Sequence, residues 1–389
     1  MTTSLLRPRG QHDSNRVAMV ELFFDLVFVF AVTQLSHALL SDLSVHGALQ
    51  TLLLFLAVWW LWIFTSWVTN WLDPERAPVR VMLFALMLGG LLLSSSIPQA
   101  FGDRGLVFGV VFAAMQVGRS VFVAYLMRDD SEGHYRTFVR ISVWLSMSGL
   151  FWILGGLAEG PARAGCWLVA VAIEYASPAL YFWVPGLGHA STLDWDVDGH
   201  HLAERCALFV IIALGESVLV TGATFAGQAW TAPTLIAFVS AFLGSVAMWW
   251  IYFDTGAERA SHRISHSDDP GRLARLAYTY LHLPIIGGVI VCAVADELVL
   301  SHPAHASNAG IAAIIGGPAL YLVGNALFKW VSHDRRAPPL SHCAGVLLLA
   351  ALAPAAYSHV LSALALGIAT TGVLVLVAVW ETMALRHRT

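Results

Sequence analysis

Long apolar stretches separated by short polar segments run through the whole chain. Each is close to or above the roughly 20 residues that a helix needs to cross a bilayer. Charged residues gather where these stretches stop, which is typical of membrane helices rather than of buried soluble ones. The pattern therefore predicts an all-α polytopic membrane bundle of about 12 transmembrane helices. The predicted spans are 20–40, 48–72, 78–98, 105–127, 137–158, 162–184, 202–227, 233–254, 273–298, 308–331, 341–360 and 361–384.

Composition agrees with this pattern. Hydrophobic residues make up 58% of the chain and charged residues 12%, and the mean hydropathy is +0.70. A soluble domain carries about twice that charged fraction. The polar N-terminus lacks a small-residue cleavage site, and the first apolar run contains Glu21 and Asp25, so we predict no cleaved signal peptide.

Basic residues indicate the orientation. Of the 21 Lys and Arg, 18 fall in the N-tail, in the C-tail or near every second connection between spans, which all lie on one side of the membrane. Only Arg104 and Arg163 lie in the connections on the opposite side. Because basic residues are retained on the cytoplasmic side, we expect a protein of the cell inner membrane with both termini in the cytoplasm. Arg119 is the one basic residue that this assignment places well inside a span.

The chain also indicates an internal repeat after six helices. Short matches occur in the same order in both halves, and an even number of helices gives both halves the same orientation, as in parallel repeats. The matches are WWLWIF at 59–64 with WWIYFD at 249–254, Glu75-Arg76-Ala77 with Glu258-Arg259-Ala260, Gly89-Gly90 with Gly287-Gly288, Val117-Gly118-Arg119 with Val323-Gly324-Asn325, Glu174 with Glu381, and Glu21 with Glu204. The predicted parts are a basic N-tail at 1–19, repeats at 20–184 and 202–384, a cytoplasmic linker at 185–201 and a C-tail at 385–389.

The densest polar signal opens the span 20–40. Glu21 and Asp25 lie one turn apart on one helix face, and Thr33 and Gln34 fall near mid-membrane. A carboxylate as deep as Asp25 is costly in a bilayer. Either this face lines an aqueous or ionic path, or Asp25 pairs with a cytoplasmic arginine and stabilises the bundle.

Two segments carry a family resemblance. ELFFDLVFVFAVTQLSH at 21–37 and ERCALFVIIALGES at 204–217, the second preceded by HHLAER at 200–205, resemble the two hallmark segments of the bacterial low temperature requirement A family. The resemblance implies a multi-pass inner-membrane protein and supplies no mechanism. Phe24-Asp25 followed by LVFVFAV is also similar to the first helix of potassium channels with a Phe-Ser-Asp motif and six-helix repeats, although Phe replaces the Ser and the second half lacks the Asp.

Further ionisable and polar residues lie inside predicted spans. Glu21 and Glu204 are interpreted as structural residues at the starts of their helices. Aligning Glu204 on Glu21 places Glu216-Ser217 on Thr33-Gln34, with Glu216 near the midplane. Glu174 lies in the middle of the span 162–184, and His282 lies at moderate depth. Each of these residues either contributes to an ion or substrate path or is a hydrogen-bonded structural group.

Several other polar groups favour structural interpretations. Asp296 and Glu297 are predicted near the outer end of their span and solvated. The loop DWDVDGHH at 194–201 is interpreted as a cap of the next helix. The four cysteines have no metal or disulfide spacing, so no metal and no cofactor are predicted.

These observations support two functional hypotheses. The first is a secondary transporter or an ion- or proton-conducting protein whose polar core is built by helices 1, 4, 6 and 7 of the predicted twelve. The second is a non-transporting membrane scaffold or cold-adaptation protein. No phosphate-binding loop, nucleophile elbow or His-Glu-x-x-His motif occurs, so we expect no enzyme. The expected partners are the lipid bilayer and a small ion or proton, and not nucleic acid.

Overall fold

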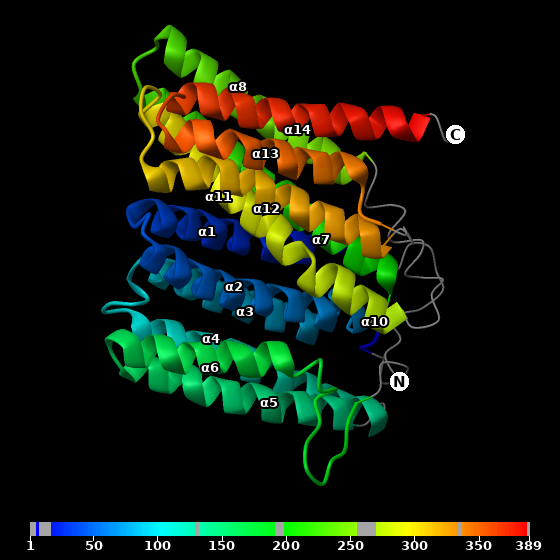
Figure 1. Ribbon diagram of the computed structural model, residues 1–389. Coiled ribbons are helices and arrows are strands. Elements are labelled where there is room, and N and C mark those ends of the chain that lie inside the picture. The colour runs from blue at the N-terminus through cyan, green and yellow to red at the C-terminus, as the bar shows by residue number, and fades with distance from the viewer. Residues whose placement is uncertain are drawn as a thin grey trace. The chain divides into compact units, whose positions relative to one another are not determined.

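The computed structural model describes residues 5–7, 17–128, 132–190, 198–254, 270–332 and 337–386, and this part of the chain contains helices and no strand (Figure 1). The first seven α-helices are α1 (Met19–Ser41), α2 (Val45–Trp71), α3 (Ala77–Ser96), α4 (Gly105–Met127), α5 (Glu132–Leu157), α6 (Gly160–Ala176) and α7 (Gly199–Gly227). They are followed by α8 (Ala232–Phe253), α10 (Pro270–Ala274), α11 (His282–Ser301), α12 (Asn308–Ser332), α13 (Leu340–Tyr357) and α14 (Ala363–Arg386). A 3₁₀ turn, Ile97–Gln99, follows α3, and a π-helical segment, Arg275–Tyr280, joins α10 to α11.

Eleven helices of the described residues are long and apolar enough to cross a membrane, with α10, the π-helical segment and α11 together forming the span Gly271–Ser301. This confirms the predicted all-α polytopic membrane fold. α6 is the shortest of the twelve segments that match predicted spans, with 17 residues.

The predicted end of the sixth span is wrong. α6 ends at Ala176 rather than near 184, and the chain continues through turns in which Tyr181 and Phe182 have φ values of 51° and 49°. Pro178 has no N–H for the carbonyl of Glu174, four residues earlier, and the Ser177 hydroxyl donates to that carbonyl instead at 2.7 Å. Glu174 therefore lies in the last turn of α6 and not in its middle.

The chain divides into two compact units. Unit 1 is Met1–Ala38 with Val45–Leu202, and unit 2 is Leu39–Ser44 with Ala203–Thr389. In unit 1, α4, α5 and α6 lie side by side (Figure 1). Trp152 and Trp167 pack with their ring centroids 5.4 Å apart between these helices, and both are fully buried. Helices α4 and α5 approach so closely that a Cβ atom on Gly109 would lie 2.3 Å from the Trp152 carbonyl oxygen.

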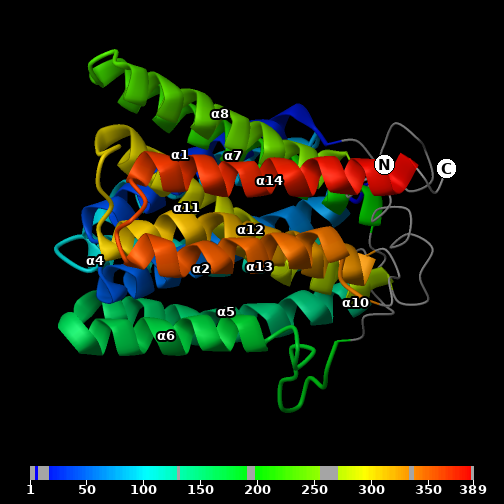
Figure 2. The ribbon, with the colours of Figure 1, turned by 45° about the horizontal axis from the view of Figure 1, so that its top comes forward.

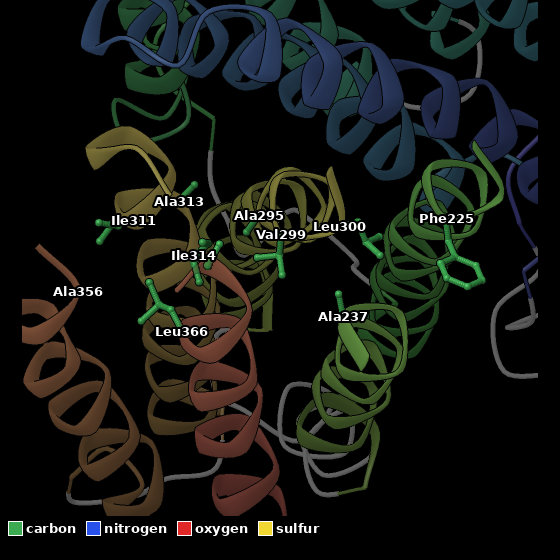
Figure 3. Packing of buried hydrophobic residues seen from close by; sticks show 11 residues of the cluster. Phe225, Ala237, Ala295, Val299, Leu300, Ile311, Ala313, Ile314, Ala356 and Leu366 are labelled. Atoms are coloured by element: carbon green, nitrogen blue, oxygen red, sulfur yellow. The ribbon is translucent and has the colours of Figure 1, made fainter. Parts of the chain in front are cut away.

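Unit 2 packs around α11 and α12, with α13 and α14 beside them (Figure 2). A Cβ atom on Gly317 of α12 would lie 2.8 Å from the backbone nitrogen of Cys292, so this glycine permits the close approach of α11. One apolar cluster of this unit joins residues of α7, α8, α11, α12, α13 and α14 (Figure 3). Its buried members are Phe225, Ala237, Ala295, Val299, Leu300, Ile311, Ala313, Ile314, Ala356, Ala363 and Leu366.

Candidate functional site

Glu174 is a buried carboxylate of unit 1 and is 1% exposed. Its Oε1 atom accepts hydrogen bonds from the Ser148 hydroxyl and from Trp152 Nε1, the latter at 3.1 Å. Its Oε2 atom accepts a hydrogen bond from Gln116 Nε2 at 3.3 Å. Three neutral donors from α4 and α5 therefore surround the carboxylate of α6.

Arg119 lies one side chain away from Glu174. Its Nη2 atom donates to Gln116 Oε1, and its Nη1 atom donates to Thr65 Oγ1 at 2.8 Å and to the Leu61 carbonyl at 3.2 Å. In the described residues no direct ion pair joins Arg119 to Glu174, because the Gln116 amide lies between them. We call Glu174, Gln116, Arg119, Ser148, Trp152 and Thr65 the Glu174 cluster.

The Glu174 cluster joins the last turn of α6 to the middle of α4. Gln116 occupies the middle of α4, and Arg119 is one turn further along the same helix. The cluster members are all buried, with exposed fractions of 2% or less. Charged and polar groups at such depth are energetically costly unless they are paired, protonated or hydrated. The arrangement can hold a carboxylate, and it can also hold the protonated acid, since the Ser148 hydroxyl can accept as well as donate.

The polar face of α1 points into unit 1. Glu21, Asp25, Phe28, Val32 and Ser36 are all buried on that face. Trp62 Nε1 of α2 donates to Asp25 Oδ1 at 2.8 Å. Two predicted path residues lie at the edge of this face: Thr33 is partly buried and donates to the Val29 carbonyl of its own helix, and Gln34 is partly buried.

Glu21 is the centre of a second polar group in unit 1. Its carboxylate contacts Arg7 Nη2 at 2.6 Å and His201 Nε2 at 3.0 Å, and it accepts the backbone N–H of Ala18. The other ring nitrogen of His201 lies 3.2 Å from the Asn70 amide nitrogen. Because that amide nitrogen can only donate, His201 Nδ1 accepts from it, and His201 Nε2 lies 3.0 Å from both Glu21 Oε1 and Arg7 Nη2. The arrangement ties the start of α1 to the start of α7 within unit 1.

The predicted cap of α7 is confirmed for Asp198, whose Oδ1 atom accepts the backbone N–H groups of His200 and His201 at 2.9 and 3.1 Å. Asp194 and Asp196 lie outside the described residues. In the described part of the chain, no group of three or more His, Cys, Asp and Glu residues could hold a metal ion.

Unit 2 contains a buried ion pair, Lys329–Glu381, that the sequence did not predict. Lys329 Nζ lies 2.6 Å from Glu381 Oε2 and donates to the Ile251 carbonyl at 2.6 Å. Lys329 was counted among the basic residues near a connection, but it lies in α12, inside the predicted span 308–331, and is 1% exposed. The match of Glu381 with Glu174 was the available signal, but it did not reveal the partner.

Two other positions also differ from the prediction. Arg163, assigned to an outer connection, lies in the first turn of α6, where its guanidinium donates to the carbonyls of Ala158, Ala100 and Gly102. It thus binds carbonyl groups where two helical segments end. Asp296, expected to be solvated near the outer end of its span, lies five residues before the end of α11 and is partly buried.

The remaining predicted residues belong to unit 2. His282 is fully buried, and its Nδ1 atom donates to the Ala277 carbonyl at 2.9 Å while its Nε2 atom accepts from the Tyr252 hydroxyl at 2.8 Å. Glu216 is 6% exposed and Ser217 is fully buried in α7. Glu204, in the second turn of α7, is partly buried. The roles of Glu216, Ser217 and Glu204 stay predictions.

The helices and their buried polar groups define a multi-pass membrane protein. The model of the bacterial low temperature requirement A protein family matches residues 16–379, and the chain belongs to this family. It is 43% identical over 380 residues to an uncharacterized protein, RA0937, of Rhizobium meliloti (strain 1021), with 96% of this chain and 91% of the relative covered. No solved structure matches the chain.

Proposed function

We propose that this protein is a secondary transporter or an ion- or proton-conducting protein of the cell inner membrane, with both termini in the cytoplasm. The observation that carries the proposal is the environment of Glu174, a buried membrane carboxylate held by the neutral donors Ser148, Trp152 and Gln116. A carboxylate without a direct cationic partner in the described residues can bind and release a proton or a small cation during a transport cycle. Buried ionisable groups in membrane spans mark such pathways.

In this proposal the helices that build the polar core differ from those favoured by the sequence. The sequence favoured helices 1, 4, 6 and 7, whereas the Glu174 cluster joins side chains of α2, α4, α5 and α6. Asp25 of α1 contacts α2 through Trp62. A contribution of Glu216 from α7 remains part of the proposal.

Matching contacts inside the two units support the proposed parallel repeat. The tryptophan pairs of α2 and α8 align Leu61 with Ile251. Arg119 of α4 donates to the Leu61 carbonyl, and Lys329 of α12 donates to the Ile251 carbonyl. In each unit the cation also approaches a glutamate of the last helix, directly in unit 2 and through Gln116 in unit 1. Parallel repeats of this kind are common in transporters.

The partners in this proposal are the bilayer and a small ion or proton. Covalent catalysis, a cofactor and nucleic acid have no part in it. The basic residues at the predicted cytoplasmic ends would face anionic lipid headgroups.

The test is flux in proteoliposomes, with a panel of monovalent cations and a pH-sensitive dye inside the vesicles. Glu174→Gln removes the titratable group but keeps a similar shape, so we expect a folded protein whose flux is lost. Glu159→Gln is the matched control because Glu159 is exposed before α6, and it should leave the flux unchanged. Wild-type vesicles without any cation or proton flux, or full flux in Glu174→Gln, would contradict the proposal.

A non-transporting scaffold or cold-adaptation protein is the second candidate. It is favoured by the direct buried ion pairs Lys329–Glu381 and Arg7–Glu21, which join separate segments and suit a rigid bundle. On this hypothesis, Glu174→Gln would lower the melting temperature but would still restore growth in the cold to a strain that lacks the protein.

A further inference from the structure

Unit 2 contains a small, partly open cavity that adjoins its apolar cluster and is lined by polar and apolar residues. Its volume is about 30 Å³. A single water molecule requires roughly 10–15 Å³ on this measure, so the cavity can hold about two water-sized groups. Its lining residues come from α8, α11, α12 and α14, and the polar ones are Ser240, Cys292, Asp296, Thr370 and Thr371.

The walls of the cavity are otherwise apolar. Ala295, Val299 and Ile314 lie close together in the apolar cluster of unit 2, and all three also line the cavity (Figure 3). Apolar walls limit the access of water, so a charge beside them interacts more strongly with its neighbours than it would in bulk solvent.

Asp296 supplies the only formal charge of the cavity lining. Its carboxylate receives no hydrogen bond and forms no ion pair among the described residues, although it lies one to two turns inside α11. It precedes Ser301 by five positions, which places it about 8 Å from that helix end at the usual helical rise. A carboxylate at this depth requires a counter-charge, a proton or water.

The hydroxyl groups of the cavity offer oxygen lone pairs rather than protons. Thr371 donates to the Ser240 carbonyl, Ser240 donates to Thr371 Oγ1, and Thr370 donates to the Gly367 carbonyl. Since each hydroxyl has one proton, these bonds leave acceptor positions for an occupant. The thiol of Cys292 is a weak donor, so the cavity favours a cation over an anion.

A proline adds a further acceptor. Pro318 lies within α12 and has no N–H for the carbonyl of Ile314, four residues earlier, and both residues line the cavity. Backbone carbonyl groups released in this way coordinate Na⁺ or protons in transporters. One carboxylate provides a single negative charge, which matches a monovalent cation better than a divalent one in a medium of low dielectric constant.

We propose that Asp296, Ser240, Thr370, Thr371 and the Ile314 carbonyl form a binding site for a partly dehydrated monovalent cation of the size of Na⁺. A larger hollow of about 420 Å³ lies next to it and is lined by the α11–α12 connection, including His302 and His305. Ile314 lines both spaces, so the cavity and the hollow adjoin at this residue. The cation enters through the hollow, which the predicted orientation places on the outer side of the membrane.

The test is equilibrium binding by the purified full-length protein, which requires no transport. Melting temperature is measured at constant ionic strength while choline chloride is replaced by LiCl, NaCl or KCl. We expect a saturable increase with NaCl for the wild type, because a cation that binds the folded state stabilises it. Binding of ²²Na⁺ should saturate over the same concentration range.

Asp296→Asn should remain helical and lose both responses. The matched control is Glu297→Gln, since Glu297 is the next residue and does not line the cavity, and it should respond as the wild type does. Thr371→Val should shift saturation to higher NaCl, and it tests the site if Asp296→Asn does not fold. No difference between NaCl and choline chloride in the wild type would overturn the proposal, as would a full response in Asp296→Asn or a stabilisation that follows pH alone.

Because this test measures binding in unit 2, its outcome is independent of flux through the Glu174 cluster. A protein that binds Na⁺ but carries no flux would contradict the transport proposal and leave this site intact. Flux without Na⁺ binding would contradict this site and leave the transport proposal intact.

Discussion

The buried pair Lys329–Glu381 allows a quantitative prediction. Lys329 is the only lysine of the chain, and we consider its replacement by methionine, which keeps most of the side-chain volume. The change removes the 2.6 Å contact with Glu381 Oε2 and the hydrogen bond to the Ile251 carbonyl. The other carboxylate oxygen of Glu381, Oε1, has no hydrogen-bond partner in the described residues, and His342 Nε2 lies 3.9 Å from Oε2, beyond hydrogen-bond distance.

Removing one partner of a buried ion pair costs about 3–5 kcal/mol, because the other charge stays buried without compensation. For a domain of this size each 1 kcal/mol lowers the melting temperature by about 2–4 °C. We therefore expect Lys329→Met to melt roughly 6–20 °C below the wild type in a thermal denaturation assay of the purified protein. Replacing Glu381 by leucine as well should restore most of the loss, because the double variant has no buried charge at this position.

Arg136 and Glu132 provide the control. Their nitrogen–oxygen distance is also 2.6 Å, but their side chains are 61% and 75% exposed. Solvent screens such a pair, so Arg136→Met should cost less than about 1 kcal/mol. The reasoning would be refuted if Lys329→Met melted within about 2 °C of the wild type, the least shift that 1 kcal/mol would cause. It would also be refuted if the double variant were no more stable than Lys329→Met.

Further predictions concern topology, packing and polar contacts. Reporter domains that are active only outside the cytoplasm should be silent at both termini; an active C-terminal fusion would contradict the even number of spans. Gly109→Ala should lower the melting temperature through its clash with α5, whereas Gly118→Ala, which meets no atom within 4 Å, should not; equal melting temperatures would argue against the close α4–α5 contact. His201→Ala should lower the melting temperature more than His200→Ala, because His201 is buried against Glu21 while His200 is exposed. Glu216→Gln should keep the protein folded and reduce flux in proteoliposomes if Glu216 contributes to the path, and unchanged flux would assign it a structural role.

The sequence by itself determined the helical class and the approximate spans. A helix satisfies all its backbone hydrogen bonds within one segment, which is required in lipid, so local hydropathy predicts where helices cross the membrane. The ends are less well determined, since α6 stops at Ala176 where Pro178 and the turns after it interrupt the helix. The two hallmark segments also sufficed for the family assignment, which the family comparison confirms.

Only the tertiary structure decided which polar groups meet. Glu174 and Arg119 were both selected from the sequence, yet the residue between them is Gln116, and two donors to Glu174 come from α5. Lys329 was counted only as a basic residue near a connection, and its buried partner Glu381 was not predicted, because hydropathy averages over a window and does not report which way a side chain points. Pairing depends on the rotation of each helix about its axis and on the packing of its neighbours. Those contacts join residues far apart in the chain, and no local pattern of apolar and polar residues encodes them.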